Sequence, residues 1–188
     1  MCGFTWSVRP HFMDYQAFWC EENIWRLTTD PEVTPGERWV VLLTGTSGHV
    51  ACWGQRASGA PEAPVLWDYH VVLAVRHTTW DIWDLDCRLG CPVPAMAWLA
   101  ATFPNSDTVR PALRPRFLLI PADEFRMQFT SDRAHMRTAD GGWQQPPPPW
   151  SAPCASPGTT LAMYVERARR GLYLHDLTTR FSSRAEPR

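Results

Sequence analysis

The 188-residue sequence contains no lysine, and arginine supplies all 18 of its basic side chains. With 19 acidic residues, the net charge at pH 7 is only −1. A chain this close to neutrality has no electrostatic basis for binding nucleic acid or an anionic membrane surface, so we expect neither as a partner. We attribute the use of arginine in place of lysine to a genomic bias, with no functional content.

Long apolar runs and a leader segment are also missing. No hydrophobic stretch is long enough to span a bilayer, and residues 1–6 lack the basic and then apolar regions of a secretory signal. We therefore expect a cytoplasmic protein. The 45% of hydrophobic and 20% of charged residues are typical of a globular chain, and no internal repeat or linker is evident. Residues 1–188 are accordingly predicted to form a single domain, which we expect to be a monomer.

Metal ligands at the usual spacing are scarce. The sequence has six cysteines, which we expect to be free thiols in a reducing compartment. Cys87 and Cys91 are close enough to suggest a metal, but no second pair of cysteine or histidine residues lies nearby at ligand spacing. We therefore predict no metal site.

Cys20 is the leading candidate nucleophile, because it stands where a helix is expected to begin. Ile24 and Leu27 follow at helical spacing, and Glu21 and Glu22 occupy the first turn, where carboxylates interact favourably with the helix dipole. At a helix N-terminus, backbone N–H groups lower the pKa of a thiol and can bind a developing oxyanion. Taken alone, however, a cysteine is more often a buried apolar residue.

Residues 65–75 predict the strand that carries the candidate base. Alternate side chains form one apolar face, which we expect to pack on the core: Trp67, Tyr69, Val71, Leu73 and Val75. The opposite face carries Asp68 and His70, so His70 is expected to point toward a cleft. A single histidine is more often a hydrogen-bonded structural residue, so its partner matters.

The partner comes from the next predicted strand, residues 81–87. A short turn near His77 implies an antiparallel hairpin, and His70 and Asp84 each lie seven residues from His77. They should therefore be near-opposite neighbours with side chains on one face. Asp86 shares the face of Asp84 and remains an alternative partner for His70.

The remaining segments complete an α+β prediction, with the nucleophile helix packed on an antiparallel sheet. Strands are predicted at residues 38–43, with 49–53 as the hairpin partner, and at 116–120. Helices are predicted at 94–103, 122–129, 161–169 and 172–181.

Residues 130–159 predict an ordered loop, because the run Pro146 to Pro149 cannot form a helix or a central strand. Trp143 and Trp150 flank these prolines, which favours packing on the protein's own surface over display to a partner. Within this loop we expect Asp132 and Arg133 to form a structural ion pair.

Several motifs, in order along the chain, support a family assignment. They are Tyr15 five residues before the thiol, Cys20-Glu21-Glu22-Asn23-Ile24-Trp25, Trp67-Asp68-Tyr69-His70-Val71-Val72-Leu73, Asp84-Leu85-Asp86, Ser131-Asp132-Arg133-Ala134-His135-Met136, and Trp143 before the four prolines. With this ordered set the chain resembles the protein N-terminal glutamine amidohydrolases. The N-terminus and residues 45–63 look less familiar.

The resemblance implies a papain-like or transglutaminase-like cysteine hydrolase fold with a Cys20, His70 and Asp84 triad, and it favours Asp84 over Asp86. The implied reaction converts the N-terminal glutamine of a peptide or protein to glutamate through a thioester, with release of ammonia and without metal or organic cofactor. The same three groups would also serve a cysteine peptidase or a transglutaminase-like acyltransferase. A third possibility is a binding module that uses the proline run and an inert triad.

Recognition of a free N-terminal glutamine requires a partner for its α-ammonium group. Glu21, next to the thiol, and Asp68, on the face of His70, are the acidic candidates for this substrate contact. Tyr15 is a further substrate-binding candidate, since residues 1–17 are expected to wall the site. Either acid could instead be structural, because acids at a helix start commonly serve the dipole.

Overall fold

The computed structural model describes residues 15–31, 33, 35–104 and 106–183. Most of the predicted aromatic wall, residues 1–14, lies outside this range. The helices of the described chain are α1 (Cys20–Leu27), α2 (Ala95–Thr102), α3 (Ala122–Gln128), α4 (Leu161–Arg169) and α5 (Leu174–Ser182), with short 3₁₀ turns η1 (Pro111–Leu113) and η2 (Ala134–Met136). The strands are β1 (Glu37–Thr44), β2 (Val50–Cys52), β3 (Val65–Trp67), β4 (His70–Arg76), β5 (Trp80–Trp83), β6 (Val93–Pro94), β7 (Arg116–Pro121), β8 (Phe129–Thr130) and β9 (Thr159–Thr160).

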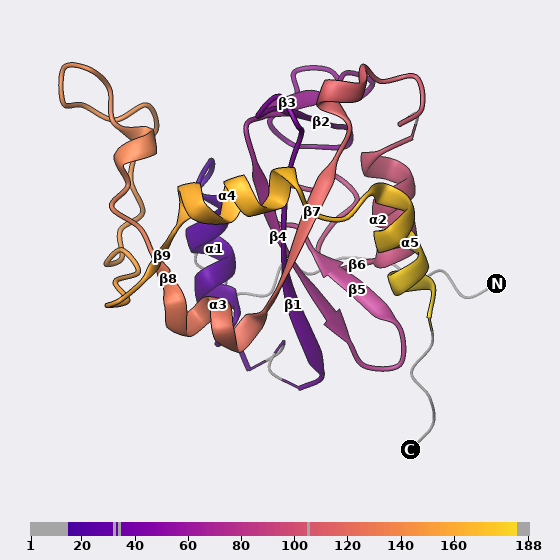
Figure 1. Cartoon of the computed structure of the whole chain (residues 1–188), viewed down its shortest axis with the longest axis horizontal. Coiled ribbons are helices and arrows are strands. Elements are labelled where there is room, and N and C mark those ends of the chain that lie inside the picture. The colour runs from indigo at the N-terminus through magenta and orange to yellow at the C-terminus, as the bar shows by residue number, and fades with distance from the viewer. Residues whose placement is uncertain (1–14, 32, 34, 105, 184–188) are drawn as a thin grey trace.

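Five strands form an antiparallel sheet in the order β6-β5-β4-β1-β7, which confirms the expected α+β architecture (Figure 1). One apolar cluster joins α1, α3 and α4 to one face of the sheet, and a second joins α2 and α5 to the other. Val71 and Leu73 of β4 enter the first cluster, while Val72 and Ala74 enter the second. The prediction that only one face of this strand is core is therefore wrong, because helices cover both faces.

The predicted strand over residues 65–75 is two strands. β3 pairs with β2 in a small separate sheet, and β4 begins at His70 in the main sheet. The predicted pairing of residues 49–53 with β1 is thus wrong. Both edges of β1 are already occupied, by β4 and β7, so no edge is left for β2.

The hairpin of β4 and β5 forms as predicted, but its register differs. Val75 is opposite Asp81 and Leu73 is opposite Trp83, a shift of two residues from the predicted pairing. β5 ends at Trp83 rather than continuing to residue 87. Because the shift is an even number of residues, each side chain keeps its predicted face. Asp84 therefore lies in the turn directly after β5, near the start of β4.

The other helices lie close to their predicted positions. α5 begins at Leu174 rather than at Leu172, because the Leu172 backbone exchanges hydrogen bonds with Phe117. The helix then starts with a reciprocal cap in which the Tyr173 N–H donates to the Asp176 carboxylate at 2.9 Å. No helix of the described chain is both long enough and apolar enough to cross a membrane.

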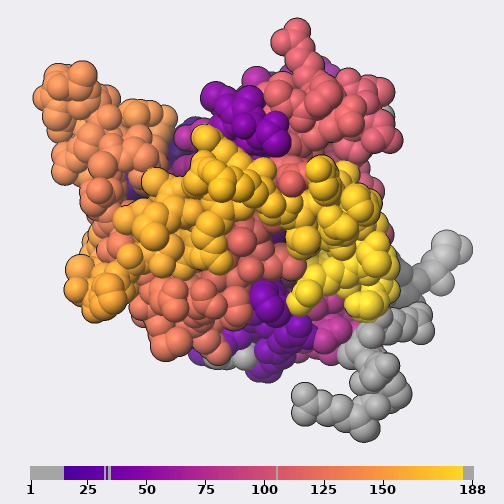
Figure 2. Space-filling view, viewed as in Figure 1, coloured from indigo at the N-terminus to yellow at the C-terminus, as the bar shows by residue number. Residues whose placement is uncertain are grey.

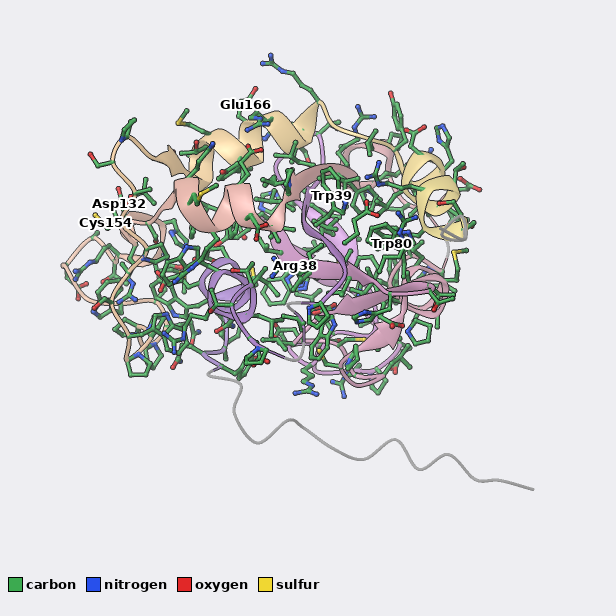
Figure 3. The ribbon with its side chains drawn as sticks, turned by 90° about the horizontal axis from the view of Figure 1, so that it is seen from below. Arg38, Trp39, Trp80, Asp132, Cys154 and Glu166 are labelled. Atoms are coloured by element: carbon green, nitrogen blue, oxygen red, sulfur yellow. The ribbon has the colours of Figure 1, made fainter. Side chains whose placement is uncertain are left out.

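Residues 131–158 form a long excursion, here called the arm, which stands out from one end of the molecule (Figures 1 and 2). β8 and β9 pair in parallel and close its base. The Ser131 N–H also donates to the Pro153 carbonyl at 2.9 Å, so Asp132 and Cys154 lie together at that end, far from Trp80 (Figure 3). As predicted, most of this segment is irregular but ordered.

Candidate active site

Cys20 is the first residue of α1 and is buried. The chain turns sharply into this helix, with Phe18 in the left-handed region at φ 68°, an unusual conformation for a bulky residue. Asn23 fixes the turn: its side chain accepts from the Gln16 N–H at 2.9 Å and donates to the Gln16 carbonyl at 2.8 Å. The helix start predicted at Cys20 is confirmed, and its first N–H groups have no intrahelical acceptor.

His70 and Asp84 are bonded to each other inside the protein, with His70 Nε2 2.9 Å from Asp84 Oδ1. The other carboxylate oxygen, Oδ2, accepts from Trp98 Nε1 at 2.9 Å and from Gln55 Nε2 at 3.1 Å. The imidazole ring stacks on Trp67, with centroids 5.6 Å apart. Because Asp84 holds Nε2, Nδ1 is the ring nitrogen left for proton transfer on the other side.

The electrostatics of this pair favour its charged form. Burial lowers the pKa of His70, but the adjacent Asp84 carboxylate outweighs this effect and raises the pKa above its ordinary 6.5. Burial conversely raises the pKa of Asp84, yet the nearby His70 and the hydrogen bonds from His70, Trp98 and Gln55 bring it below its ordinary 3.8. Asp84 is therefore ionised at neutral pH.

The thiol of Cys20 behaves differently from the prediction. Burial, followed by the negative charges of Glu21 and Asp86, raises the pKa of Cys20 well above its ordinary value. A hydrogen bond from the Val71 backbone acts in the opposite direction but does not compensate. The pKa of this thiol is thus raised, where the helix N-terminus was expected to lower it, because burial and the neighbouring carboxylates disfavour the thiolate. Attack by Cys20 requires a base to take its proton.

Asp86 does not bond to the imidazole but faces the same pocket. Tyr15 Oη donates to Asp86 Oδ1 at 2.6 Å, and burial raises the pKa of Asp86 although His70 and Tyr15 act to lower it. Ligand atoms of His70, Asp84 and Asp86 lie within 4.8 Å of one another. The closest pair is already mutually bonded, and both Asp84 oxygens accept other donors, which describes a hydrogen-bonded relay better than a metal ligand set.

A second polar cluster borders the thiol. Tyr69 Oη donates to Glu21 Oε2 at 2.8 Å, and that oxygen lies 3.7 Å from the Cys20 sulfur. His135 Nε2 is 3.1 Å from the Tyr69 hydroxyl and 3.4 Å from Glu21 Oε1. The latter contact is not aligned as a hydrogen bond, so within the described chain Glu21 Oε1 is buried without a donor. Sequence reasoning missed Tyr69 and His135, although both lie within the motifs that suggested the family.

These groups surround a pocket of about 280 Å³ with two walls. One wall comes from the start of α1 and the segment before β4, and the other from the arm. The lining residues are Phe18, Cys20, Trp67, Asp68, Tyr69, His70, Asp86, His135, Met136, Gln144 and Gln145. Asp68 thus lines the pocket, whereas Glu21 and Tyr15 do not line it but contact residues that do.

The relatives of this chain are named as hydrolases that act on an amide, and this class is compatible with an antiparallel α+β fold and a pocket that holds cysteine, histidine and carboxylates. A sequence model of the N-terminal glutamine amidase family matches residues 15–173, and the chain belongs to this family.

Several curated relatives carry the name protein N-terminal glutamine amidohydrolase. The human relative is 34% identical over 150 residues, covering 77% of this chain and 72% of its own. The Danio rerio relative is 33% identical over 146 residues, with 74% and 71% covered. The Drosophila grimshawi relative is 35% identical over 143 residues, with 71% and 68% covered.

Proposed function

We propose that this protein converts the N-terminal glutamine of peptides and proteins to glutamate and releases ammonia. The observation that carries the proposal is the buried 2.9 Å bond between His70 and Asp84 at a pocket that also exposes Cys20, in a chain whose relatives are named for this reaction. Mass spectrometry of a glutamine-initiated peptide, with an assay for ammonia, tests it. An unchanged peptide after prolonged incubation would exclude the activity.

The reaction begins with attack of the Cys20 sulfur on the side-chain amide carbon, while His70 takes the thiol proton. The carbonyl oxygen becomes an oxyanion, which the free N–H groups at the start of α1 stabilise. His70 then protonates the amide nitrogen, the carbon–nitrogen bond breaks, and ammonia leaves behind a thioester. Water attacks the thioester with His70 as base, which yields the glutamate carboxylate and restores the thiol. Asp84 holds the imidazole tautomer and stabilises the imidazolium.

We also propose that the chain forms a single domain with a papain-like or transglutaminase-like fold. Its support is the helix that carries Cys20 packed against β4, the strand that carries His70. The five cysteines of the described chain are free, which fits a cytoplasmic enzyme in a reducing compartment.

Asp68 is the proposed primary partner of the substrate α-ammonium group. It lines the pocket and is exposed, and its Oδ1 accepts the neighbouring Tyr69 N–H at 3.1 Å. Glu21 supports this site indirectly, because its carboxylate contacts Tyr69 and His135 of the pocket lining. Tyr15 contributes by orienting Asp86, to which its hydroxyl donates at 2.6 Å. Together the carboxylates of Asp68, Glu21 and Asp86 give the pocket a negative potential suited to an ammonium group.

Selectivity for a free terminus is the first expected result. The enzyme should act on a free N-terminal glutamine but not on acetylated or internal glutamine, because an acetylated terminus leaves the carboxylate that binds the ammonium unpaired. N-terminal asparagine is one methylene shorter, which moves the amide carbon by roughly 1 Å from the sulfur and costs about a hundredfold in rate. Ammonia release from matched peptides measures each ratio. Equal rates for acetylated and free glutamine would point instead to a peptidase-like or transglutaminase-like site.

The pH dependence follows from the pKa of His70. His70 must be neutral to accept the thiol proton, and Asp84 raises its pKa above 6.5, so kcat/KM should rise with pH with a midpoint above 6.5. In the Asp84→Asn variant the raising charge is lost while burial, which lowers the pKa, remains, so the midpoint should fall. NMR titration of the imidazole measures the shift without relying on activity. A midpoint that does not move would mean that Asp84 does not set the pKa of His70.

A further inference from the structure

We propose that Arg133 is a positioning residue: through an ion pair with Glu22 it sets the distance between the arm and the nucleophile helix, and the arm binds the substrate main chain beyond the N-terminal glutamine. This inference rests on the proposed function and extends it to the part of the substrate that follows the glutamine. Arg133 and Glu22 have no role in the chemical steps described above.

The ion pair is buried and geometrically specific. Arg133 Nε donates to Glu22 Oε1 at 2.8 Å and its terminal nitrogen donates to Glu22 Oε2 at 2.7 Å, a bidentate arrangement. The Glu22 side chain is fully buried, and that of Arg133 is 14% exposed. The predicted pairing of Asp132 with Arg133 is wrong, since Asp132 instead accepts from the Ala134 N–H at 2.9 Å. The acid at the second residue after Cys20 therefore anchors the arm.

The side chains of Arg133 and Glu22 also connect two segments of the arm, the one that contains Arg133 and the one that contains Trp150. Arg133 also donates to the Trp150 carbonyl at 2.8 Å, and the Trp150 indole donates to Glu22 Oε2 at 3.0 Å. Arg133 itself sits in the left-handed region at φ 57°, a conformation that the surrounding contacts must hold in place. A second anchor lies beside the first, where the Trp19 indole donates to the Pro146 carbonyl at 2.9 Å.

The anchored segments are the ones that form the arm wall of the pocket. His135 and Met136 lie two and three residues after Arg133, and Gln144 and Gln145 directly precede Pro146. Gln144 is held rigidly, because its N–H donates to the Met136 carbonyl at 2.9 Å and its side-chain nitrogen donates to the His135 carbonyl at 3.1 Å. A displacement of Arg133 is thus transmitted to the wall.

The arm is the proposed path for the rest of the substrate. With the side-chain amide at Cys20 and the α-ammonium at Asp68, the carbonyl end of the glutamine can leave along the arm, which supplies four of the lining residues. The side-chain amides of Gln144 and Gln145 offer both donors and acceptors, the groups that peptide backbone requires. The arm therefore fits an extended main chain of any sequence, as expected for an enzyme that reads only the first residue.

Substrate length separates this role from general support of the fold. We compare kcat and KM for a Gln-Gly dipeptide and a glutamine-initiated hexapeptide. Arg133→Gln should raise KM for the hexapeptide on the order of tenfold, below the about hundredfold cost of displacing the reacting atoms by 1 Å. KM for the dipeptide and kcat for both peptides should stay within about threefold of wild type, because the chemical groups remain in place.

A second variant separates the proposed effect on substrate binding from a loss of folding. Arg133→Gln leaves the buried Glu22 without its counter-charge, so the double variant Glu22→Gln with Arg133→Gln removes both charges and should show the same hexapeptide effect with a retained thermal transition. Arg137→Gln is the matched control, since Arg137 lies in the same arm but stacks on Trp143 and donates to the Gly141 carbonyl, both within the arm. It should leave all four constants unchanged.

Two results would overturn the inference and are distinguishable. If the wild type is active but the variants change KM equally for both peptides, lower kcat, or change nothing, the arm does not bind the main chain through this pair, and the proposed function stands. If the wild type releases no ammonia from either peptide, the proposed function fails and the inference fails with it.

Discussion

Replacement of Cys20 by alanine is expected to abolish ammonia release, by about 10⁴-fold or more, without loss of the fold. The substitution removes the only thiol among the described residues that line the pocket, and it takes away little packed volume. Helix α1 keeps its entry turn, because Asn23 and Gln16 are untouched. Ammonia release and thermal unfolding followed by circular dichroism give the two readouts.

Cys154→Ala is the matched control for this experiment. Cys154 is a free and exposed cysteine outside the pocket, so its removal should leave the rate at the wild-type value. Activity of Cys20→Ala near that of the wild type would exclude Cys20 as the nucleophile. An unfolded Cys20→Ala protein would instead contradict the claim that this thiol contributes little to packing.

The second large effect is expected for Asp84→Asn, which should lower the rate far more than Asp86→Asn. Asp84 uses both oxygens as acceptors: Oδ1 toward His70 and Oδ2 toward Trp98 and Gln55. An asparagine must turn its NH₂ group toward one of these sets of donors. If the NH₂ group faces Trp98 and Gln55, the indole and amide donors are left unsatisfied. If it faces His70, it selects the wrong imidazole tautomer.

The expected loss for Asp84→Asn is on the order of 10³ to 10⁴ in kcat, as for the orienting acid of a triad, together with reduced stability from an unsatisfied buried donor. Asp86→Asn still accepts from Tyr15 and does not touch the imidazole, so its effect should be about tenfold or less. Steady-state kinetics of both variants on one glutamine-initiated peptide decide between them. Greater damage from Asp86→Asn would reverse the assignment of the orienting acid.

Local sequence patterns were sufficient for the elements that carry the site. The spacing of Ile24 and Leu27 behind Cys20 reflects one face of a helix, and that face enters the core as predicted. The alternation of residues 65 to 75 and the turn near His77 predicted the hairpin, which forms between β4 and β5. Although the register was wrong by two residues, His70 and Asp84 still meet, because the period of a strand is two and an even shift preserves the face.

Such local patterns could not predict contacts between segments that are distant in the chain. That β2 pairs with β3 rather than with β1 depends on which strand edges remain free after the sheet has assembled. The partner of Arg133 is Glu22, 111 residues earlier, and nothing in the spacing of charges distinguishes it from the adjacent Asp132.

The sequence by itself determined the candidate nucleophile and base and the α+β class, because each depends on residue type and short-range periodicity. Its ordered motifs resembled a known family, and that resemblance favoured Asp84 over Asp86 as the acid. Only the tertiary structure decided that burial and nearby carboxylates raise the pKa of the Cys20 thiol, that Tyr69 and His135 contact Glu21, and that the arm forms the second wall of the pocket. Burial and long-range proximity set the electrostatics of a site, and both arise only when segments remote in the chain pack against one another.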